Sequence, residues 1–191
     1  MSETTGRRER KKAQTRQALA DAAMRLFTER GYDDVGVREV AAEADVAVTT
    51  LFKHFPSKEA LVFDEDEDKE AALVAAVRDR APGQSVLHAL RDHLMRNYEK
   101  VTGDTSAYAA MMNLVNATPA LQDYMHRMWL RHETALTTAI TEAVGAPEGD
   151  ARVAALAHFA LEAPRLLHGR EDPQRALQEI FGLLEHGWGD D

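Results

Sequence analysis

The chain has 191 residues, 45% of them hydrophobic, and contains no cysteine. This size and apolar content allow a buried core, whereas the lack of cysteine excludes disulfides, thiolate metal sites and a cysteine nucleophile. No apolar run reaches the length of about 18 to 20 residues that a membrane span needs, and the first residues lack the apolar segment of a secretory signal. We therefore expect a cytoplasmic protein with no membrane partner.

The formal net charge of −9 is distributed unevenly along the chain. Residues 1–60 hold 11 Lys and Arg against 10 Asp and Glu, whereas residues 61–191 hold 12 against 22. Binding to DNA requires cations that neutralise phosphates, so this step in charge predicts a DNA-facing N-terminal part and an acidic body. Residues 1–14 are predicted to form a basic, disordered arm, which is either a solvated tail or a contact to the DNA backbone or minor groove.

The periodicity of apolar residues predicts an all-α protein of about nine helices. Apolar residues recur at steps of three and four, and long alternating runs of β-branched residues do not occur. The first helix is predicted to stop at Gly31, followed by short helices over about 37–44 and 47–55. Pro56 then breaks the chain, and Ser57 is predicted to cap helix four. Later breaks are expected at residues 81–83, 102–104, 118–119, 145–149 and 169–173, with a tail at 188–191.

The two short helices have the pattern of a helix-turn-helix. Small Ala41 lies where the helices would cross, Asp45 and Val46 form the turn, and Val46 and Leu51 would hold the second helix in place. A helix that enters the major groove needs small or hydrogen-bonding residues toward the bases and cations near the flanking phosphates. That face is predicted to consist of Val48, Thr49, Thr50, Lys53 and His54.

The segment from Thr15 to Leu61 resembles the N-terminal domain of the TetR (tetracycline-repressor) family nearly end to end. The resemblance is strongest in the blocks AAMRLFTERGY and TTLFKHFPSKEAL and covers about a quarter of the chain. It implies a three-helix DNA-binding domain at 15–61 and a helical regulatory body at 62–187. Such a body would enclose an inducer pocket and dimerise through its last two helices. The partners expected are therefore an operator duplex, a second copy of the chain and a small-molecule effector.

The resemblance also assigns roles to single residues. Arg38 would reach a base, and Thr49 and Thr50 would face the groove. Phe52 and His54 would touch the backbone, and Lys58, at the start of helix four, would hold a phosphate beside free backbone N–H groups.

Three residues depart from the family pattern. Asp45 replaces a turn Gly that needs a left-handed conformation, which Asp tolerates better than most residues. Ala47 replaces a capping Ser, so one capping hydroxyl is missing, and Asp45 is the alternative cap. Phe52 replaces a Tyr and has no hydroxyl for a phosphate, so that it either keeps a backbone contact or packs against the first helix.

Neither a metal site nor an enzyme is predicted. The acidic run at residues 64–68 points around most of a helix and is expected to be a solvated face rather than a cation site. His132 and Glu133 lack the second His that a zinc-protease helix would place at position 136. The sequence also contains neither a motif that pairs a nucleophile with a base nor a Gly-rich phosphate-binding loop. We expect no cofactor.

The body contains flexible and aromatic side chains that can line an apolar ligand cavity, although residues at helical spacing belong to the core more often than to the wall of a ligand site. Arg165 would either anchor an anionic group or face the dimer partner. The candidate pocket residues are Tyr108, Met111, Met112, Met125, Trp129, Phe159 and Arg165.

Two helices over about 149–169 and 172–186 are predicted to form a four-helix contact with a second protomer. A ligand in the body would move helix four and so change the spacing of the two DNA-binding domains. The alternative is a helical small-molecule-binding protein or enzyme with a vestigial DNA-binding domain. The predicted interface residues are Leu156, Phe159, Leu166, Leu177, Ile180, Phe181 and Leu184.

Overall fold

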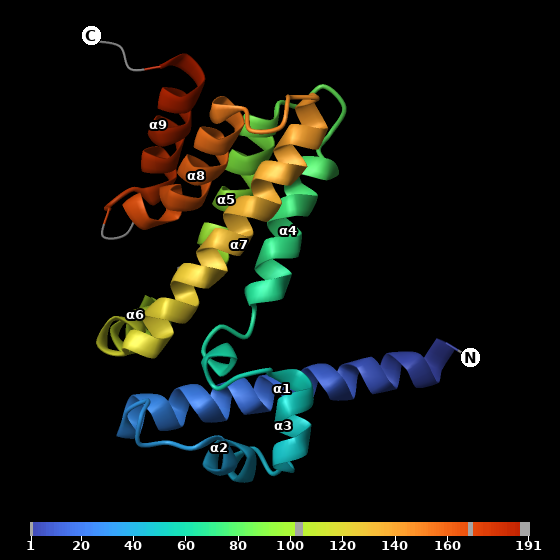
Figure 1. Ribbon diagram of the computed structural model, residues 1–191, viewed down its shortest axis with the longest axis vertical. Coiled ribbons are helices and arrows are strands. Elements are labelled where there is room, and N and C mark those ends of the chain that lie inside the picture. The colour runs from blue at the N-terminus through green and yellow to red at the C-terminus, as the bar shows by residue number, and fades with distance from the viewer. Residues whose placement is uncertain (1, 102–104, 168–169, 188–191) are drawn as a thin grey trace. The chain divides into compact units, whose positions relative to one another are not determined.

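The computed structural model describes residues 2–101, 105–167 and 170–187. Over these ranges the chain forms nine α-helices and one short 3-10 helix, with no strand (Figure 1). The all-α prediction is confirmed, and the helix breaks predicted at 81–83 and 145–149 fall between observed helices. Of the break predicted at 118–119, only Thr118 lies between helices, because Pro119 is the first residue of α7. The predicted break at 102–104 and the tail at 188–191 lie outside the described residues.

The chain divides into two compact units. Unit 1 comprises Met1–Asp66 and Ser106–His126, and unit 2 comprises Glu67–Thr105 and Arg127–Asp191. Residues 106–126 therefore pack with the N-terminal helices, although they lie between the two segments of unit 2 in the sequence. The chain passes between the units at three places, which are the start of α4 (Asp66–Arg78), the start of α6 (Thr105–Ala117) and a point within α7 (Pro119–Val144).

Unit 1 is built on α1 (Ser2–Arg30), α2 (Val37–Glu43), α3 (Val48–His54) and the 3-10 helix η1 (Glu59–Leu61). It also contains α6 (Thr105–Ala117) and the first turns of α7. The apolar stripe that ends α1 packs on α2, α3 and η1 because residues three and four apart share one helix face. The fully buried side chains of this core include Leu19, Ala23, Phe27, Val40, Leu51, Phe55, Leu61, Val115 and Leu121.

Unit 2 contains α4, α5 (Val86–Val101), the rest of α7, α8 (Ala151–Leu166) and α9 (Pro173–His186). The last two helices begin at side-chain caps. The Asp150 carboxylate accepts from the Arg152 amide at 2.8 Å, and that of Asp172 accepts from the Arg175 amide at 2.9 Å. The core of this unit includes Leu73, Val77, Leu90, Leu136, Ile140, Ala157, Leu161, Leu177 and Phe181.

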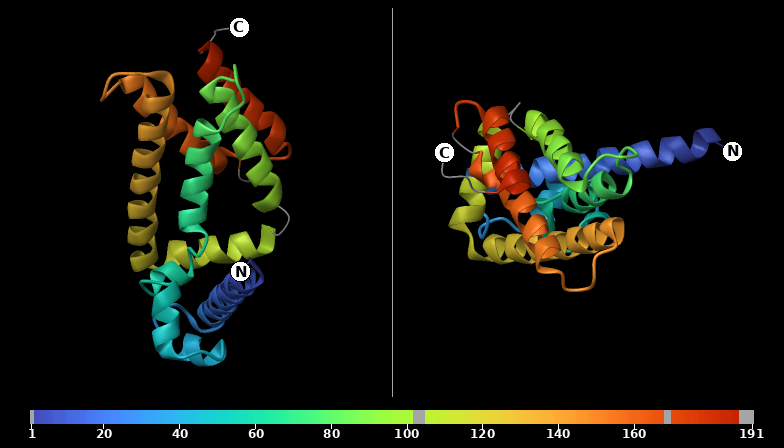
Figure 2. Two further views of the ribbon diagram at one scale, coloured as in Figure 1. Left: turned by 90° about the vertical axis from the view of Figure 1, so that its right-hand side faces the viewer. Right: turned by 90° about the horizontal axis from the view of Figure 1, so that it is seen from above.

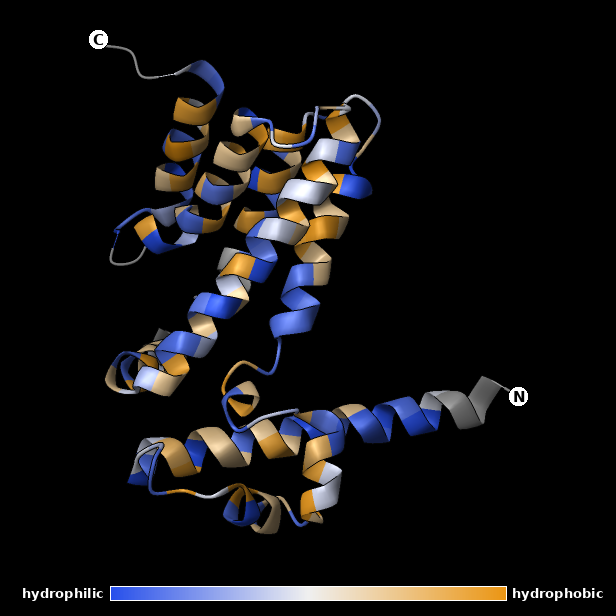
Figure 3. Cartoon of the chain, in the orientation of Figure 1, coloured by the Kyte–Doolittle hydropathy of each residue, from blue (hydrophilic) through white to orange (hydrophobic). Residues whose placement is uncertain are grey.

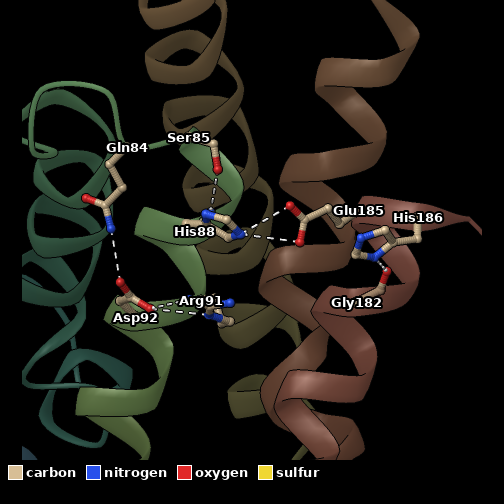
Figure 4. A network of polar contacts seen from close by, with 8 residues as sticks. All are labelled: Gln84, Ser85, His88, Arg91, Asp92, Gly182, Glu185 and His186. Atoms are coloured by element: carbon tan, nitrogen blue, oxygen red, sulfur yellow. Dashed lines mark hydrogen bonds and ion pairs between the residues drawn. The ribbon is translucent and has the colours of Figure 1, made fainter.

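Helices α5, α8 and α9 pack against one another in unit 2, as Figure 2 shows. A polar contact accompanies the apolar packing of α5 on α9, because His88 Nε2 lies 3.2 Å from a carboxylate oxygen of Glu185 (Figure 4). Both side chains are more than a third exposed, so this pair adds little to stability next to the buried apolar residues.

Two helix boundaries differ from the sequence prediction. Residues 2–14 are part of α1 rather than a disordered arm. Residues 7–14 consist of Arg, Lys, Glu, Gln and Ala, which have high helix propensity, and the segment contains no proline. Helix four begins at Asp66, not near Ser57. The Ser57 hydroxyl does accept a bond from the Ala60 amide at 3.3 Å, but the turn that it caps is the short η1.

Among the described residues, no helix combines the length and the apolar character needed to cross a bilayer.

Candidate nucleic-acid interface

The start of α2 is fixed by a carboxylate that reaches back to the backbone. Glu39 Oε2 accepts from the Gly36 amide at 2.9 Å, and Glu39 Oε1 lies 2.8 Å from Arg30 Nη1. The Gly36 bond and then the Arg30 guanidinium lower the pKa of Glu39. Since Arg30 is the last residue of α1, this contact ties the beginning of α2 to the end of α1.

The turn between α2 and α3 is tight and left-handed at Asp45. Its φ is +52°, and the following Val46 amide donates to the Ala41 carbonyl at 2.9 Å. The prediction that Asp45 would adopt the left-handed conformation is confirmed. The prediction that its carboxylate caps α3 is wrong, because Ala47 occupies the cap position and no side chain bonds there. Instead the Thr50 amide donates to the Ala47 carbonyl at 2.8 Å.

Helix α3 has one side in the core and leaves the rest available to a partner. Leu51 is fully buried, while Thr49, Phe52 and Lys53 are exposed. The exposed fraction of Phe52 is 50%, which argues against its packing role beside α1. Of the other predicted contacts, Arg38 on α2 is exposed and Val48, Thr50 and His54 are half-buried.

Arg16, which the sequence analysis did not single out, holds the end of α3. Its Nη1 donates to the His54 carbonyl at 2.9 Å, and its Nη2 donates to the Asp64 carbonyl. Its guanidinium carbon lies 4.5 Å from the centre of the Phe55 ring. Nothing in the sequence indicated that Arg16 bridges these two segments, because its partners are backbone carbonyls far along the chain.

His54 lies in an environment that disfavours its charged form. Burial, followed by the nearby cations Lys12 and Arg16, lowers the pKa of His54. Its Nδ1 is buried and has no hydrogen-bond partner among the described residues. The ring therefore stays neutral at neutral pH, and a backbone contact through His54 would be a hydrogen bond rather than an ion pair.

Lys58 is engaged within unit 1. Its ammonium donates to the Tyr32 carbonyl and lies 3.9 Å from the centre of the Tyr32 ring. The Tyr32 hydroxyl donates to Glu59 Oε1 at 3.0 Å, and burial is the main cause that raises the pKa of Tyr32. Lys58 thus joins the segment before η1 to the loop after α1. Sequence reasoning assigned it only a phosphate contact and placed it at a helix start that the structure does not have there.

The predicted interface residues in unit 2 separate into two groups. Phe159 and Leu166 are exposed, with exposed fractions of 51% and 56%, and Leu156, Ile180 and Leu184 are half-buried. Leu177 and Phe181 lie in the core of the protomer, because the inward face of α9 packs on α5 and α8. These two residues are therefore not part of an exposed apolar surface.

The candidate pocket residues are divided between the two units. Met111 and Met125 pack against the core of unit 1, whereas Trp129 packs against that of unit 2. Tyr108 and Met112 are half-buried on α6, and Phe159 and Arg165 are exposed. A cavity of about 300 Å³ in unit 2 is lined by small and polar residues of α4, α5 and their connection, among them Ala72, Asp79, Arg80, Asp92 and His93.

Comparison with known proteins agrees with the geometry of unit 1. The model of the family "bacterial regulatory proteins, tetR family" matches residues 19–64, which include α2, α3 and η1. The HTH-type transcriptional regulator TcmR of Streptomyces glaucescens is 33% identical over 129 residues, covering 64% of this chain and 57% of that protein. The chain spans between 57% and 61% of the length of the curated relatives that it first matches.

Solved structures share the fold over nearly the whole chain. A TetR-family regulator from Streptomyces coelicolor A3 has a TM-score of 0.59 at 19% identity, with 91% of this chain and 93% of that chain covered. FadR of Thermus thermophilus, a repressor of the same family solved in complex with lauroyl-CoA, has a TM-score of 0.53 at 24% identity, with 92% and 96% covered. At such identities the likeness concerns the arrangement of helices.

Proposed function

We propose that this chain is a DNA-binding transcriptional regulator of the TetR type that represses genes from an operator in the cytoplasm, since residues 19–64 match the model of that family and TcmR is 33% identical over 129 residues. The observation that carries the proposal is the exposed side of α3, where Thr49 and Lys53 stand on a helix that Leu51 holds in the core. Thr offers hydrogen bonds to base edges and Lys a charge to phosphates, as groove recognition requires. Arg38 adds a further base contact from α2.

The protein would act as a homodimer. Exposed apolar side chains on α8 and α9, such as Phe159, Leu166 and Leu183, supply surface for a second copy. Two copies related by a two-fold axis would read a near-palindrome with half-site centres about 34 Å apart, or a small multiple of that distance.

The effector would be a small apolar or amphipathic molecule that binds unit 2. The fold similarity to FadR of T. thermophilus, which was solved with lauroyl-CoA, supports this class of ligand. The chain passes between the units in α4 and α7, so these helices would carry a change in unit 2 to unit 1. Release from DNA then requires that the ligand favour the conformation that cannot bind the operator.

Selection of duplexes from a random pool by the purified protein tests the proposal. We expect enrichment of a near-palindrome. Arg38→Ala and Thr49→Ala should change which bases are selected, whereas Lys53→Ala should weaken binding to all sequences alike. Arg175→Ala in unit 2 is the matched control for loss of a cation and should leave selection unchanged. A pool without enrichment would overturn the proposal and favour a small-molecule-binding protein with a vestigial DNA-binding domain.

A further inference from the structure

The N-terminal part of α1 extends as a helix beyond the residues that form the core of unit 1. The helix has 29 residues, about 44 Å at a rise of 1.5 Å per residue, but from residue 6 onward its first buried side chain is Leu19. Figures 1 and 2 show this part projecting past α2 and α3, and Figure 3 shows its hydrophilic character. We call residues 6–18 the N-terminal extension.

Three cations of the extension form a row along one face of α1. Arg8, Lys12 and Arg16 are spaced by four residues, so they lie one above another on the helix. The same face continues into Leu19 and Ala23, which pack in the core. The row therefore lies on the side of α1 that packs on the helix-turn-helix.

The row begins at the end of α3. Arg16 is bound to the His54 carbonyl, and Lys12 is near enough to His54 to help lower its pKa. From there the row leads outward to Arg8. Lys12 and Arg8 are exposed, and neither has a hydrogen bond or ion pair to any described residue.

The charges of the row do not stabilise α1 itself. Like charges at a spacing of four destabilise a helix by about 0.2–0.5 kcal/mol for each pair, and the extension contains one acidic residue, Glu9, against six cations. Arg10, on the opposite face, instead bonds to the Gly6 carbonyl of its own helix at 3.2 Å. An uncompensated row on one face calls for an anionic partner outside unit 1.

We propose that Arg8 and Lys12 bind successive backbone phosphates of the operator duplex, next to the groove that α3 enters. This inference rests on the proposed function and adds a second contact surface to it. Residues four apart on a helix have Cβ atoms about 5–6 Å apart, which suits neighbouring phosphates on one strand. Long, flexible cationic side chains outside the groove supply affinity without reading bases. The footprint on DNA would therefore extend beyond the bases that α2 and α3 select.

The test compares two double variants of the full chain. Arg8→Gln with Lys12→Gln removes the row, whereas Arg7→Gln with Arg10→Gln removes two cations of the same segment from other sides of the helix. Gln preserves helix propensity, and circular dichroism at neutral pH checks that helix content is unchanged. The dissociation constant for the duplex selected in the random-pool experiment is measured by fluorescence anisotropy at about 50 to 200 mM KCl.

Loss of the row should reduce the slope of log affinity against log salt by about 1.8 per bound protomer, since each phosphate contact contributes about 0.9. Affinity near 0.1 M salt should then fall about tenfold or more. For the matched variant with Arg7 and Arg10 replaced, the salt slope should change by less than half as much as for the row variant. Trimming the duplex to its two half-sites should remove the difference between the row variant and wild type. Equal slopes for the two variants, or tighter binding when the row is removed, would overturn the inference and leave the proposed function intact. A wild-type protein that binds no duplex would overturn both.

Discussion

Lys58 is a cation for which the sequence alone does not distinguish a phosphate contact from a structural role within unit 1. Its position in the motif suggests a phosphate contact, yet its ammonium bonds to the Tyr32 carbonyl and lies over the Tyr32 ring. Partial burial lowers the pKa of Lys58, and the neighbouring carboxylates of Asp33 and Glu59 act in the opposite direction. The side chain is therefore part of the structure that holds η1 beside α1.

Replacement of Lys58 by Met should lower the free energy of unfolding by about 1–2 kcal/mol. The variant keeps the aliphatic length but loses a charge-assisted hydrogen bond and a cation–π contact. Chemical denaturation followed by circular dichroism measures the change. Lys53→Met, at an exposed position of α3, is the control and should leave stability nearly unchanged. An unaltered unfolding midpoint for Lys58→Met would show that the ammonium does not hold the fold.

At the scale of elements, the α2–α3 turn depends on one residue with a positive φ. Asp45 is the only residue other than glycine with such a conformation in the part of the chain that the structure describes. A Cβ branch makes this conformation costly, whereas Asp and Asn tolerate it.

Asp45→Val should therefore destabilise the protein by about 1–2 kcal/mol and weaken operator binding, because α3 is held by the turn. Asp45→Asn should behave like wild type in both respects. Thermal unfolding together with the anisotropy assay separates the two variants. Equal stability of Val and Asn at position 45 would contradict the strain argument.

Much of the element pattern could be predicted from local signals. Gly31, Pro82 and Gly145 mark helix ends, and the left-handed Asp45 follows from the turn that the resemblance requires. The start of helix four could not be predicted because a capping Ser looks the same in the sequence whether an α-helix or, as at Ser57, a short 3-10 helix follows it. Arg16 and Tyr32 were missed because their partners lie about 27 to 48 residues away in sequence, and no periodicity encodes such contacts.

At the scale of the whole molecule, a helix face cannot be assigned to a protomer core or to a partner from its apolar pattern alone. Both sides of α9 contain large apolar residues, so Leu177 and Phe181 looked equivalent to Ile180 and Leu184 in the sequence. Only the packing of α9 on α5 and α8 separates them.

Substitutions on the two sides should accordingly have different effects. Phe159→Ala and Leu166→Ala should raise the dimer dissociation constant about tenfold or more with little change in helix content, as expected for apolar anchors at an interface. Leu177→Ala should instead cost about 2–5 kcal/mol of stability, as for a buried leucine. Analytical ultracentrifugation over a concentration series measures the first effect and thermal unfolding the second. Unchanged self-association of the Phe159 and Leu166 variants would exclude α8 as the contact.

The core of unit 1 includes Val115 and Leu121, which are supplied from far along the chain by α6 and the start of α7. A chimaera that joins residues 1–61 to the body of a relative would have other side chains in place of Val115 and Leu121. The core beneath its DNA-binding helices would then be poorly packed. A chimaera that carries residues 106–126 together with the N-terminal segment should keep the original DNA specificity, since the complete core of unit 1 is then transferred with the DNA-binding helices.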